Sequence, residues 1–357
     1  MNDNRIAVLG GGGIGLATAT DLSNRGYKVN LFELPKFKEN ILPIKKIGGI
    51  NFSGVMGSGF AKINIITTNI NEAIKNTKLI ILAAPATVHR EFIESCLSYL
   101  RDGQIFITET GYFSCLRFKE IIKKSVKNIL IAEMNLTPYT SSKEGDNNIF
   151  IHSYRDEIYI AALPAIETPN VINSIKNIYP GIVPAKNVLQ TSFDNANWIM
   201  HAPFALPFRG LFERAKDYVL PIKDAIIPSA IKLTTAMENE KELLGKAYGL
   251  ELPKFEHIFK SGKSWEEALE NSPEFNTWKL KYKNGHNTYM TEDLYFALPI
   301  VSRLADVVKV PVPTVKSFLH LFSIIDNIDY MNLGLSLKDI GIDGFTVEEI
   351  IKFVEVG

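Results

Sequence analysis

Residues 6–27 read IAVLGGGGIGLATATDLSNRGY, and this stretch decides the fold of the first half of the chain. An apolar run predicted to be a strand leads directly into Gly10, Gly12 and Gly15, which satisfy the pattern G-x-G-x-x-G ahead of a predicted helix. Gly10 permits a tight turn, Gly12 lets the backbone approach a pyrophosphate, and Gly15 lets the helix pack closely on the strand. The stretch therefore predicts a dinucleotide-binding turn.

Two further features complete the predicted cofactor site. The helix begins at Gly13 and Ile14, whose free N–H groups and positive dipole end favour an anion. Pro85 and Ala86 follow a later strand, and ligands of parallel sheets bind beyond the carboxyl ends of strands, so a nicotinamide ribose would lie against this turn. His89 opens the next helix, and we expect it to face either the substrate cleft or solvent.

Glu33 sets the expected cofactor. It ends the second predicted strand, eighteen residues after Gly15, where a carboxylate accepts a hydrogen bond from the ribose 2′-OH and repels a 2′-phosphate. NAD is therefore preferred over NADP. Lys36 and Lys38 follow closely and could offset the repulsion, which keeps NADP open.

The pattern of apolar residues predicts two domains in the 357-residue chain. Strand-like runs alternate with helical patterns up to about residue 185, which indicates βαβ units and a parallel sheet. Beyond residue 187 we expect the strands to stop and helical spacing to take over. We therefore expect a Rossmann-type α/β domain over residues 1–187 and an all-helical substrate domain over residues 188–357. The runs predicted as strands are RIAVLG, YKVNLFE, KINIITTN, KLIILAAPA, QIFITET and NILIAEM.

Composition argues against several classes of protein. Lysine plus arginine balance aspartate plus glutamate at 39 each, without a basic run, so a nucleic-acid partner is not expected. The N-terminus lacks the features of a signal peptide and no run approaches the length of a membrane span, so a cytoplasmic protein without a membrane partner is expected. Cys96 and Cys115 are too few for a disulfide framework, and no metal-ligand spacing occurs.

One histidine in the second half is a candidate acid/base. In NANWIMHAP, residues 195–203, Asn197 and His201 are four apart and share a helix face. Because Ala202 precedes Pro203, it is not expected in the interior of a helix. His201 is then expected near a helix end or kink. Spacing alone leaves two interpretations open: a catalytic acid/base, or a buried histidine bonded to a carbonyl.

Beyond these motifs, the chain resembles the opine dehydrogenase (octopine and nopaline dehydrogenase) family over nearly its full length. The resemblance implies a Rossmann domain followed by a helical domain, with the substrate in the cleft between them. It also implies that His201 is the acid/base and that Asp293, in TYMTEDLYF, pairs with it. The stretches that carry the resemblance are VLGGGGIGLATATDLSNRGYKV, AAPATVHREF, IAEMNLTPY, AALPA, NANWIMHAP, AMENEKELLGKAYGL and TYMTEDLYFALPIVSRLADVVKVPVPTVKSFLHL.

The reaction implied by the resemblance is the NAD(P)-dependent reductive condensation of an amino acid with an α-keto acid through an imine. Asn197 is expected to orient the substrate or the histidine. Because both substrates carry carboxylates, an arginine clamp is expected, with Arg209, Arg214 and Arg303 as candidates. Phe296 and the aromatic residues around His201 depart from the family pattern, so individual substrates are not carried over.

Two alternatives stay open. A 2- or 3-hydroxy acid dehydrogenase of the wider Rossmann-plus-helical group would rely on a lysine in the helical domain, and Lys223 and Lys232 are present outside any clear motif. A non-catalytic NAD(P)-binding sensor is the other alternative. A homodimer is compatible with each of these interpretations.

Overall fold

The computed structural model of the chain describes residues 4–122, 128–214, 217–254, 267, 279–283 and 288–357. The chain folds into two compact units, Met1–Thr191 with Val354–Gly357, and Ser192–Phe353. The boundary expected between residues 187 and 188 thus falls four residues later, and the last four residues, expected in the helical domain, group with the first unit. Val354 is fully buried and Glu355 Oε1 lies 3.7 Å from Lys186 Nζ, which ties this end of the chain to the first unit.

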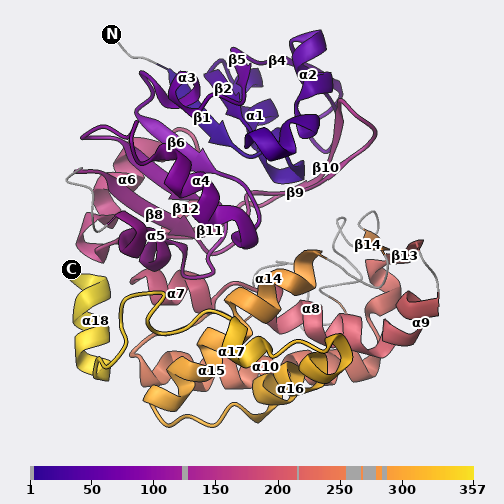
Figure 1. The fold of residues 1–357 in the computed structure, drawn as a ribbon, viewed down its shortest axis with the longest axis vertical. Coiled ribbons are helices and arrows are strands. Elements are labelled where there is room, and N and C mark those ends of the chain that lie inside the picture. Colours follow the sequence, from indigo (N-terminus) through magenta and orange to yellow (C-terminus); the bar gives the residue numbers. More distant parts are fainter. Residues whose placement is uncertain (1–3, 123–127, 215–216, 255–266, 268–278, 284–287) are drawn as a thin grey trace. The chain divides into compact units, whose positions relative to one another are not determined.

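The first unit contains an eight-stranded, mostly parallel sheet (Figure 1). Its order is β12-β11-β8-β7-β6-β1-β2-β5. Pairing is parallel from β5 through to β8, whereas β11 runs antiparallel to β8 and β12 pairs parallel with β11. The strands are β1 (Arg5–Leu9), β2 (Lys28–Phe32), β5 (Ile65–Thr67), β6 (Leu79–Leu82), β7 (Ile105–Thr108), β8 (Leu130–Met134), β11 (Ile158–Leu163) and β12 (Ile182–Pro184).

A second, four-stranded sheet of order β4-β3-β10-β9 belongs to the same unit. Its strands are β3 (Gly49–Gly54), β4 (Gly59–Lys62), β9 (Tyr139–Lys143) and β10 (Asn148–Tyr154). The helices of the unit are α1 (Gly13–Asn24), α2 (Leu42–Ile47), α3 (Ile70–Ile74), α4 (His89–Cys96), α5 (Ser114–Ile122) and α6 (Thr168–Ile175), with short 3₁₀ helices η1 (Pro35–Asn40), η2 (Ala86–Val88) and η3 (Ala165–Glu167). α7 (Val188–Phe193) spans the boundary between the units.

Each of the six runs predicted as strands contains a strand of the large sheet, β1, β2, β5, β6, β7 or β8. Their side chains are almost all buried because helices cover a parallel sheet on both faces, so the runs are continuously apolar. The second sheet is missing from the sequence prediction. Its strands mix buried with half-exposed polar residues and glycine, a weaker pattern than a continuous apolar run.

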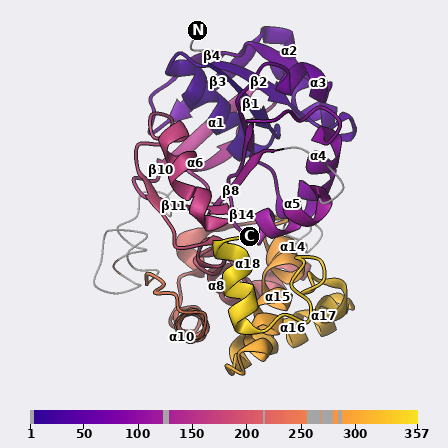
Figure 2. The same ribbon diagram turned by 90° about the vertical axis from the view of Figure 1, so that its left-hand side faces the viewer.

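The second unit is helical, as predicted, with one addition (Figures 1 and 2). The expectation that strands stop after residue 187 is wrong for β13 (Asp217–Pro221) and β14 (Lys279–Lys283), which pair antiparallel. The described helices are α8 (Asn197–Ala205), η4 (Leu206–Phe208), α9 (Arg209–Arg214), η5 (Ile222–Ala225), α10 (Pro228–Ala247), α14 (Thr288–Phe296), α15 (Leu298–Val307), α16 (Pro313–Asp326), α17 (Tyr330–Leu333) and α18 (Val347–Glu355), whose last two residues belong to the first unit.

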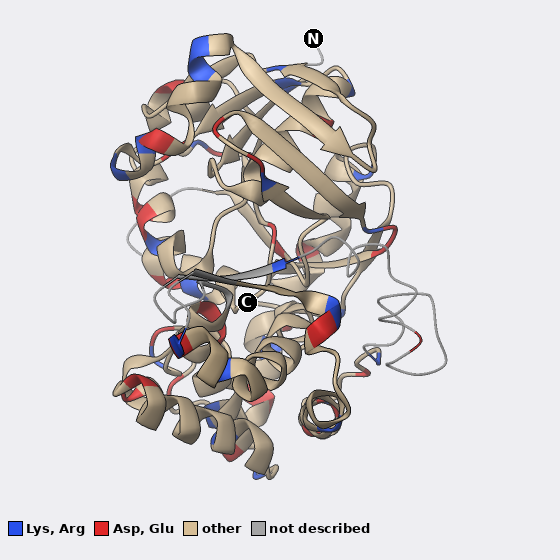
Figure 3. Ribbon diagram, turned by 90° about the vertical axis from the view of Figure 1, so that its right-hand side faces the viewer, with Lys and Arg blue, Asp and Glu red and all other residues tan. Residues whose placement is uncertain are grey.

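Charged residues of both signs are interspersed along the described ribbon (Figure 3), in keeping with the equal numbers of acidic and basic residues in the sequence. Both cysteines, Cys96 and Cys115, are free and buried. Among the helices that the structure describes, none combines the length and the apolar character needed to cross a bilayer.

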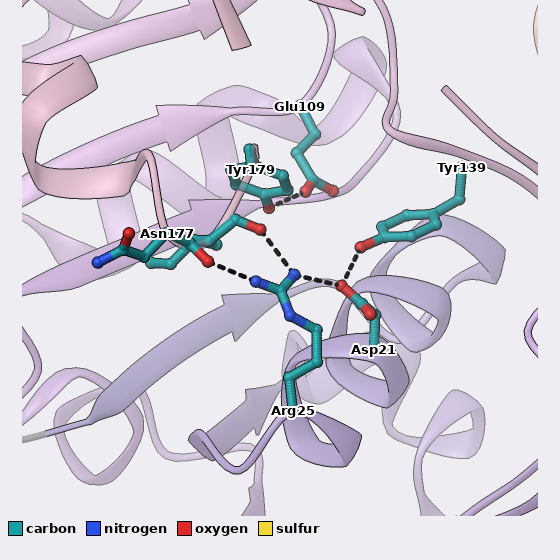
Figure 4. A network of polar contacts seen from close by, with 7 residues as sticks. Asp21, Arg25, Glu109, Tyr139, Asn177 and Tyr179 are labelled. Atoms are coloured by element: carbon teal, nitrogen blue, oxygen red, sulfur yellow. Dashed lines mark hydrogen bonds and ion pairs between the residues drawn. The ribbon is translucent and has the colours of Figure 1, made fainter. Parts of the chain in front are cut away.

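A buried polar network anchors helix α1 within the first unit (Figure 4). Tyr179 Oη donates to Glu109 Oε1 over 2.5 Å, and Thr18 Oγ1, on α1, donates to Glu109 Oε2 over 2.8 Å. One turn further along α1, Asp21 accepts from Tyr139 Oη at 2.7 Å. Burial raises the pKa of both tyrosines well above the usual value, so both hydroxyls stay protonated and donate.

Arg25, at the end of α1, closes the network. Its guanidinium lies 3.0 Å from Asp21 Oδ2 and donates to the carbonyls of Asn177 and Ile178, in the turn after α6. Helix α1 is thereby joined to the end of β7, to β9 and to that turn, three segments that are distant in sequence.

Glu109 should make the stability of the chain depend on pH. Burial raises its pKa from the usual 4.5 to about 7, helped by Asp21 and opposed by the hydroxyls of Tyr179 and Thr18. The folded chain holds the Glu109 proton more tightly than the unfolded chain does. The contribution of Glu109 to stability is therefore fully present below about pH 4.5 and is lost as pH rises to about 7. Glu109→Gln should remove this loss. As pH rises from about 4.5 to about 7, the free energy of unfolding of the variant should therefore increase by roughly 3 kcal/mol relative to that of wild type.

Urea unfolding at several pH values measures this difference. Glu157→Gln, at an exposed glutamate of the same unit, is the control and should show no such gain. A constant difference between wild type and Glu109→Gln from pH 4.5 to 8 would contradict the role given to the Glu109 proton.

Candidate functional site

The glycine turn has the geometry that each glycine was predicted to supply. Gly10 has a φ of +119°, and a Cβ at Gly15 would lie 1.9 Å from the carbonyl oxygen of Gly10. A Cβ at Gly10 would lie 2.4 Å from the carbonyl oxygen of Ala83, just after β6. A Cβ at Gly12, in contrast, would meet nothing within 4 Å. Gly10 and Gly15 are thus required by close packing, whereas Gly12 borders open space that a ligand can approach.

The start of α1 leaves N–H groups available for an anion. The first hydrogen bond of the helix runs from Leu16 N to Gly12 O, at 3.0 Å. The N–H groups of Gly13, Ile14 and Gly15 precede it and have no carbonyl within the helix to bind. Together with the open space at Gly12, these donors fit the pyrophosphate of a dinucleotide.

Glu33 lies beside this turn, at the end of β2. Its Oε2 accepts from Gly11 N at 2.9 Å and from Asn40 Nδ2 at 3.0 Å, and its Oε1 accepts from Leu34 N at 2.8 Å. Only 3% of the residue is exposed. The carboxylate is therefore fixed in position by three donors, next to Gly11, which lies between the first two glycines of the motif.

The turn at Pro85 and Ala86 follows β6, and its preceding residues, Ala83 and Ala84, pack against Gly10. The expectation that His89 faces the cleft or solvent is wrong: the residue is 1% exposed. Its Nε2 donates to Ala84 O at 2.8 Å and its Nδ1 lies 3.2 Å from Ser114 Oγ. Burial lowers the pKa of His89 to about 3, so the neutral imidazole braces this turn.

His201 and Asp293 form a buried pair in the second unit. Nδ1 of His201, on α8, lies 2.7 Å from Oδ2 of Asp293, on α14, although 92 residues separate them. His201 is 6% exposed and Asp293 is fully buried. The carboxylate accepts the Nδ1 proton, which orients the ring and fixes the tautomer that carries the proton on Nδ1.

Helix α8 does not end at His201. It continues through Ala202 and Pro203 to Ala205, so the expectation of a helix boundary before Pro203 is wrong. Proline removes one backbone donor and costs helix stability, but every residue from Trp198 to Ala205 is buried, and this packing offsets the cost. His201 is the fifth of nine residues of the helix rather than a terminal one.

The remaining substrate candidates occupy different environments in the second unit. Asn197 is the first residue of α8 and is half-buried, with its N–H donated to Asn195 Oδ1 at 3.1 Å. Arg209 lies 2.8 Å from Asp326 Oδ1 and 3.0 Å from Glu213 Oε1, and Arg303 donates to the carbonyl of Met331. Both arginines are thus engaged within the helical unit. Arg214 is exposed.

Two further features have no signal in the sequence. Strand β9 packs along α1 and brings Ser141 to Gly13 and Lys143 to Asn40. In the second unit, Lys241 is 2% exposed, donates to Pro253 O at 2.9 Å and lies 3.6 Å from Asp194 Oδ1. Neither lysine lies in a recognisable motif, because its partners are distant in sequence. Among the described residues, no group of three His, Cys, Asp or Glu side chains could hold a metal ion.

Two family models match the chain. Residues 184–325 match the model for the NAD/NADP octopine/nopaline dehydrogenase alpha-helical domain, and residues 5–132 match the model for the NAD-dependent glycerol-3-phosphate dehydrogenase N-terminus. The opine dehydrogenase of Arthrobacter sp. (strain 1C) is 26% identical over 99% of this chain and 100% of its own length. The vitopine synthase of Allorhizobium ampelinum is 21% identical over 98% of each chain.

Solved structures show the same fold. Octopine dehydrogenase with NADH and L-arginine superposes with a TM-score of 0.74 at 14% identity, over 97% of each chain. Yersinopine dehydrogenase with NADP⁺ superposes with a TM-score of 0.68 at 15% identity, over 98% of this chain and 97% of that one. The full-length sequence relatives and the two family models agree with this architecture. Over nearly its full length the chain is thus similar to the opine dehydrogenases, with a Rossmann-type dinucleotide-binding unit followed by a helical unit.

Proposed function

We propose that the chain is an NAD(P)-dependent dehydrogenase that joins the amino group of an amino acid to the carbonyl carbon of an α-keto acid. The observation that carries the proposal is the buried His201–Asp293 pair, at 2.7 Å, in a unit that matches the octopine/nopaline dehydrogenase helical domain. The solved relatives with NADH and either L-arginine or pyruvate support the two substrate classes. The roles of the individual residues are proposed together with the reaction.

The condensation has a fixed atom balance. The amine nitrogen attacks the keto carbon, water leaves, and a C=N bond forms. Reduction then adds a hydride to the carbon and a proton to the nitrogen, which gives a secondary amine with a carboxylate on each side. Bound NAD(P)H supplies the hydride.

The proton steps are assigned to His201. With its Nδ1–H donated to Asp293, its Nε2 can accept a proton as the amine attacks and return one to the departing water. The carboxylate of Asp293 lies beside the ring and stabilises the imidazolium that forms, because the two charges are opposite and both groups are shielded from water. Asn197, one helical turn before His201, is assigned to orient the substrate.

Binding of the dinucleotide is assigned to the first unit. The turn at Gly10, Gly12 and Gly15 and the N–H groups of Gly13 and Ile14 would hold the pyrophosphate. Glu33 would accept from the adenosine ribose, and Pro85 with Ala86 would lie against the nicotinamide ribose.

The lysine-dependent hydroxy acid alternative has weaker support. Lys223 and Lys232, the lysines considered from sequence, are both exposed. Lys241, which is buried in this unit, is held by Pro253 O and Asp194. The His201–Asp293 pair therefore remains the better candidate for proton transfer.

The substrate requirement separates the enzyme hypotheses. We expect NADH oxidation only when an amino acid and an α-keto acid are both present, because the reducible bond forms between them. A panel of amino acids and keto acids, followed by absorbance at the NADH band with each cofactor, measures this. Oxidation with a keto acid alone would support the hydroxy acid dehydrogenase, and binding of NADH without any turnover would support the sensor.

Replacement of the pair should affect turnover rather than cofactor binding. His201→Asn and Asp293→Asn should each lower kcat by roughly two orders of magnitude or more, because acid/base catalysis is lost. The Kd for NADH should stay near wild type, since these residues belong to the second unit. Steady-state kinetics and NADH fluorescence measure the two quantities.

His320→Asn is the matched control, because His320 is an exposed histidine of the same unit. It should leave both quantities unchanged. A variant of His201 with wild-type kcat would refute the catalytic assignment, and thermal unfolding of each variant separates loss of chemistry from loss of fold.

A further inference from the structure

Strand β9 presents alternate residues to the dinucleotide-binding region of the first unit. Tyr139 Oη reaches Asp21, on the body of α1, at 2.7 Å. The carbonyl and hydroxyl oxygens of Ser141 would each lie 3.4 Å from a Cβ at Gly13, where α1 begins. Lys143 Nζ reaches the carbonyl of Asn40 at 3.3 Å. Successive odd-numbered residues of a strand share a face, so one face of β9 follows α1 to its N-terminus and on to the residues around Glu33.

Lys143 therefore lies close to the carboxylate expected at the adenosine ribose. The link runs through one residue: Asn40 accepts from Lys143 Nζ with its carbonyl and donates from Nδ2 to Glu33 Oε2 at 3.0 Å. Burial lowers the pKa of Lys143, while the charges of Glu33 and Asp146 act in the opposite direction. The half-buried ammonium is thus a cation that senses the charge on Glu33.

Lys36 and Lys38, which lie nearer to Glu33 in sequence than Lys143 does, have different surroundings from Lys143. Lys36 Nζ lies 2.6 Å from a carboxylate oxygen of Glu91, and both side chains are about half exposed. Lys38 is exposed on η1. Lys36 is thus already paired with a carboxylate, and Lys38 belongs to a solvated surface where screening weakens its effect.

NADH and NADPH differ only at the 2′ position of the adenosine ribose, and this position requires protein groups of opposite charge in the two cases. A 2′-hydroxyl donates well to a carboxylate, whereas a 2′-phosphate is repelled by one and needs a cation. The group formed by Glu33, Asn40 and Lys143 supplies both charges from fixed positions. Glu33 holds its place through three donors, so it cannot easily turn away from a phosphate.

We propose that Lys143 is the specificity-determining residue that admits NADPH to this site, by pairing with the 2′-phosphate against the repulsion of Glu33. NADH needs no such cation, because Glu33 alone accepts from its 2′-hydroxyl. The proposal rests on the dinucleotide-binding part of the proposed function and not on the amino acid or keto acid chemistry.

Direct binding tests the proposal without any substrate. The Kd values for NADH and NADPH are measured by nucleotide fluorescence in wild type, Lys143→Met and Lys143→Arg. Lys143→Met should weaken NADPH by about tenfold to a hundredfold, the size of a charge-assisted hydrogen bond. It should change NADH by less than about threefold, and Lys143→Arg should retain NADPH, since the cation is kept.

Lys38→Met is the matched control, because it removes a lysine from the same region, and it should leave both Kd values unchanged. An equal loss of both nucleotides in Lys143→Met would overturn the proposal in favour of a structural role. Unchanged NADPH binding in Lys143→Met, or no NADPH binding by wild type, would also overturn it.

A second variant separates the two charges. Glu33→Gln should strengthen NADPH binding by removing the repulsion, and the double variant Glu33→Gln, Lys143→Met should lose part of this gain, because the phosphate then lacks its cation. Identical NADPH Kd values for Glu33→Gln and the double variant would contradict the proposal. These Kd values are measured without substrate, so they do not depend on the opine reaction. A chain that bound both nucleotides but turned over no substrate pair would contradict the proposed function, and its NADPH Kd values would still test the role of Lys143.

Discussion

The close approach of helix α1 to the end of strand β1 is the constraint on which the first unit depends. A single methyl group at Gly15 would lie 1.9 Å from the carbonyl of Gly10, so helix and strand meet at a distance that only glycine allows. Once α1 is fixed there, its first residues directly follow the open space at Gly12. Its body can reach Glu109 through Thr18 and Tyr139 through Asp21. The cofactor site and the polar network of Figure 4 are thus two ends of one helix held in one position.

Buried carboxyl groups recur at the carboxyl ends of the central strands. Glu33 follows β2, Glu109 follows β7, and Glu133 lies in β8 near its end. Each accepts from backbone N–H or hydroxyl donors: Gly11 and Leu34 for Glu33, Thr18 and Tyr179 for Glu109, Cys115 and Thr191 for Glu133. Satisfying buried acids with neutral donors avoids the cost of burying a matching cation.

The sequence was most informative where burial is continuous and least informative where partners are distant. The six predicted strands stand out because both their faces are covered, and the glycine turn because its spacing between a strand and a helix is recognisable. The second sheet and the β13–β14 ribbon could not be found in this way: the strands of the second sheet mix buried with half-exposed residues, and β13 pairs with a strand far along the chain. The pairing of His201 with Asp293 came from resemblance, since the two residues are 92 positions apart in the sequence. His89 and Lys143 show the limit for single residues, because only the fold decides that the first is buried and the second reaches Asn40.

The return of Val354–Gly357 to the first unit has a consequence for how the chain is made. The first unit is complete only when residues translated after the whole helical unit have left the ribosome. Until then the position that Val354 fills is open, and Lys186 lacks its neighbour Glu355. The helical unit is in this sense an insertion within the first unit, so a fragment cut after Thr191 would lack residues that belong to that unit.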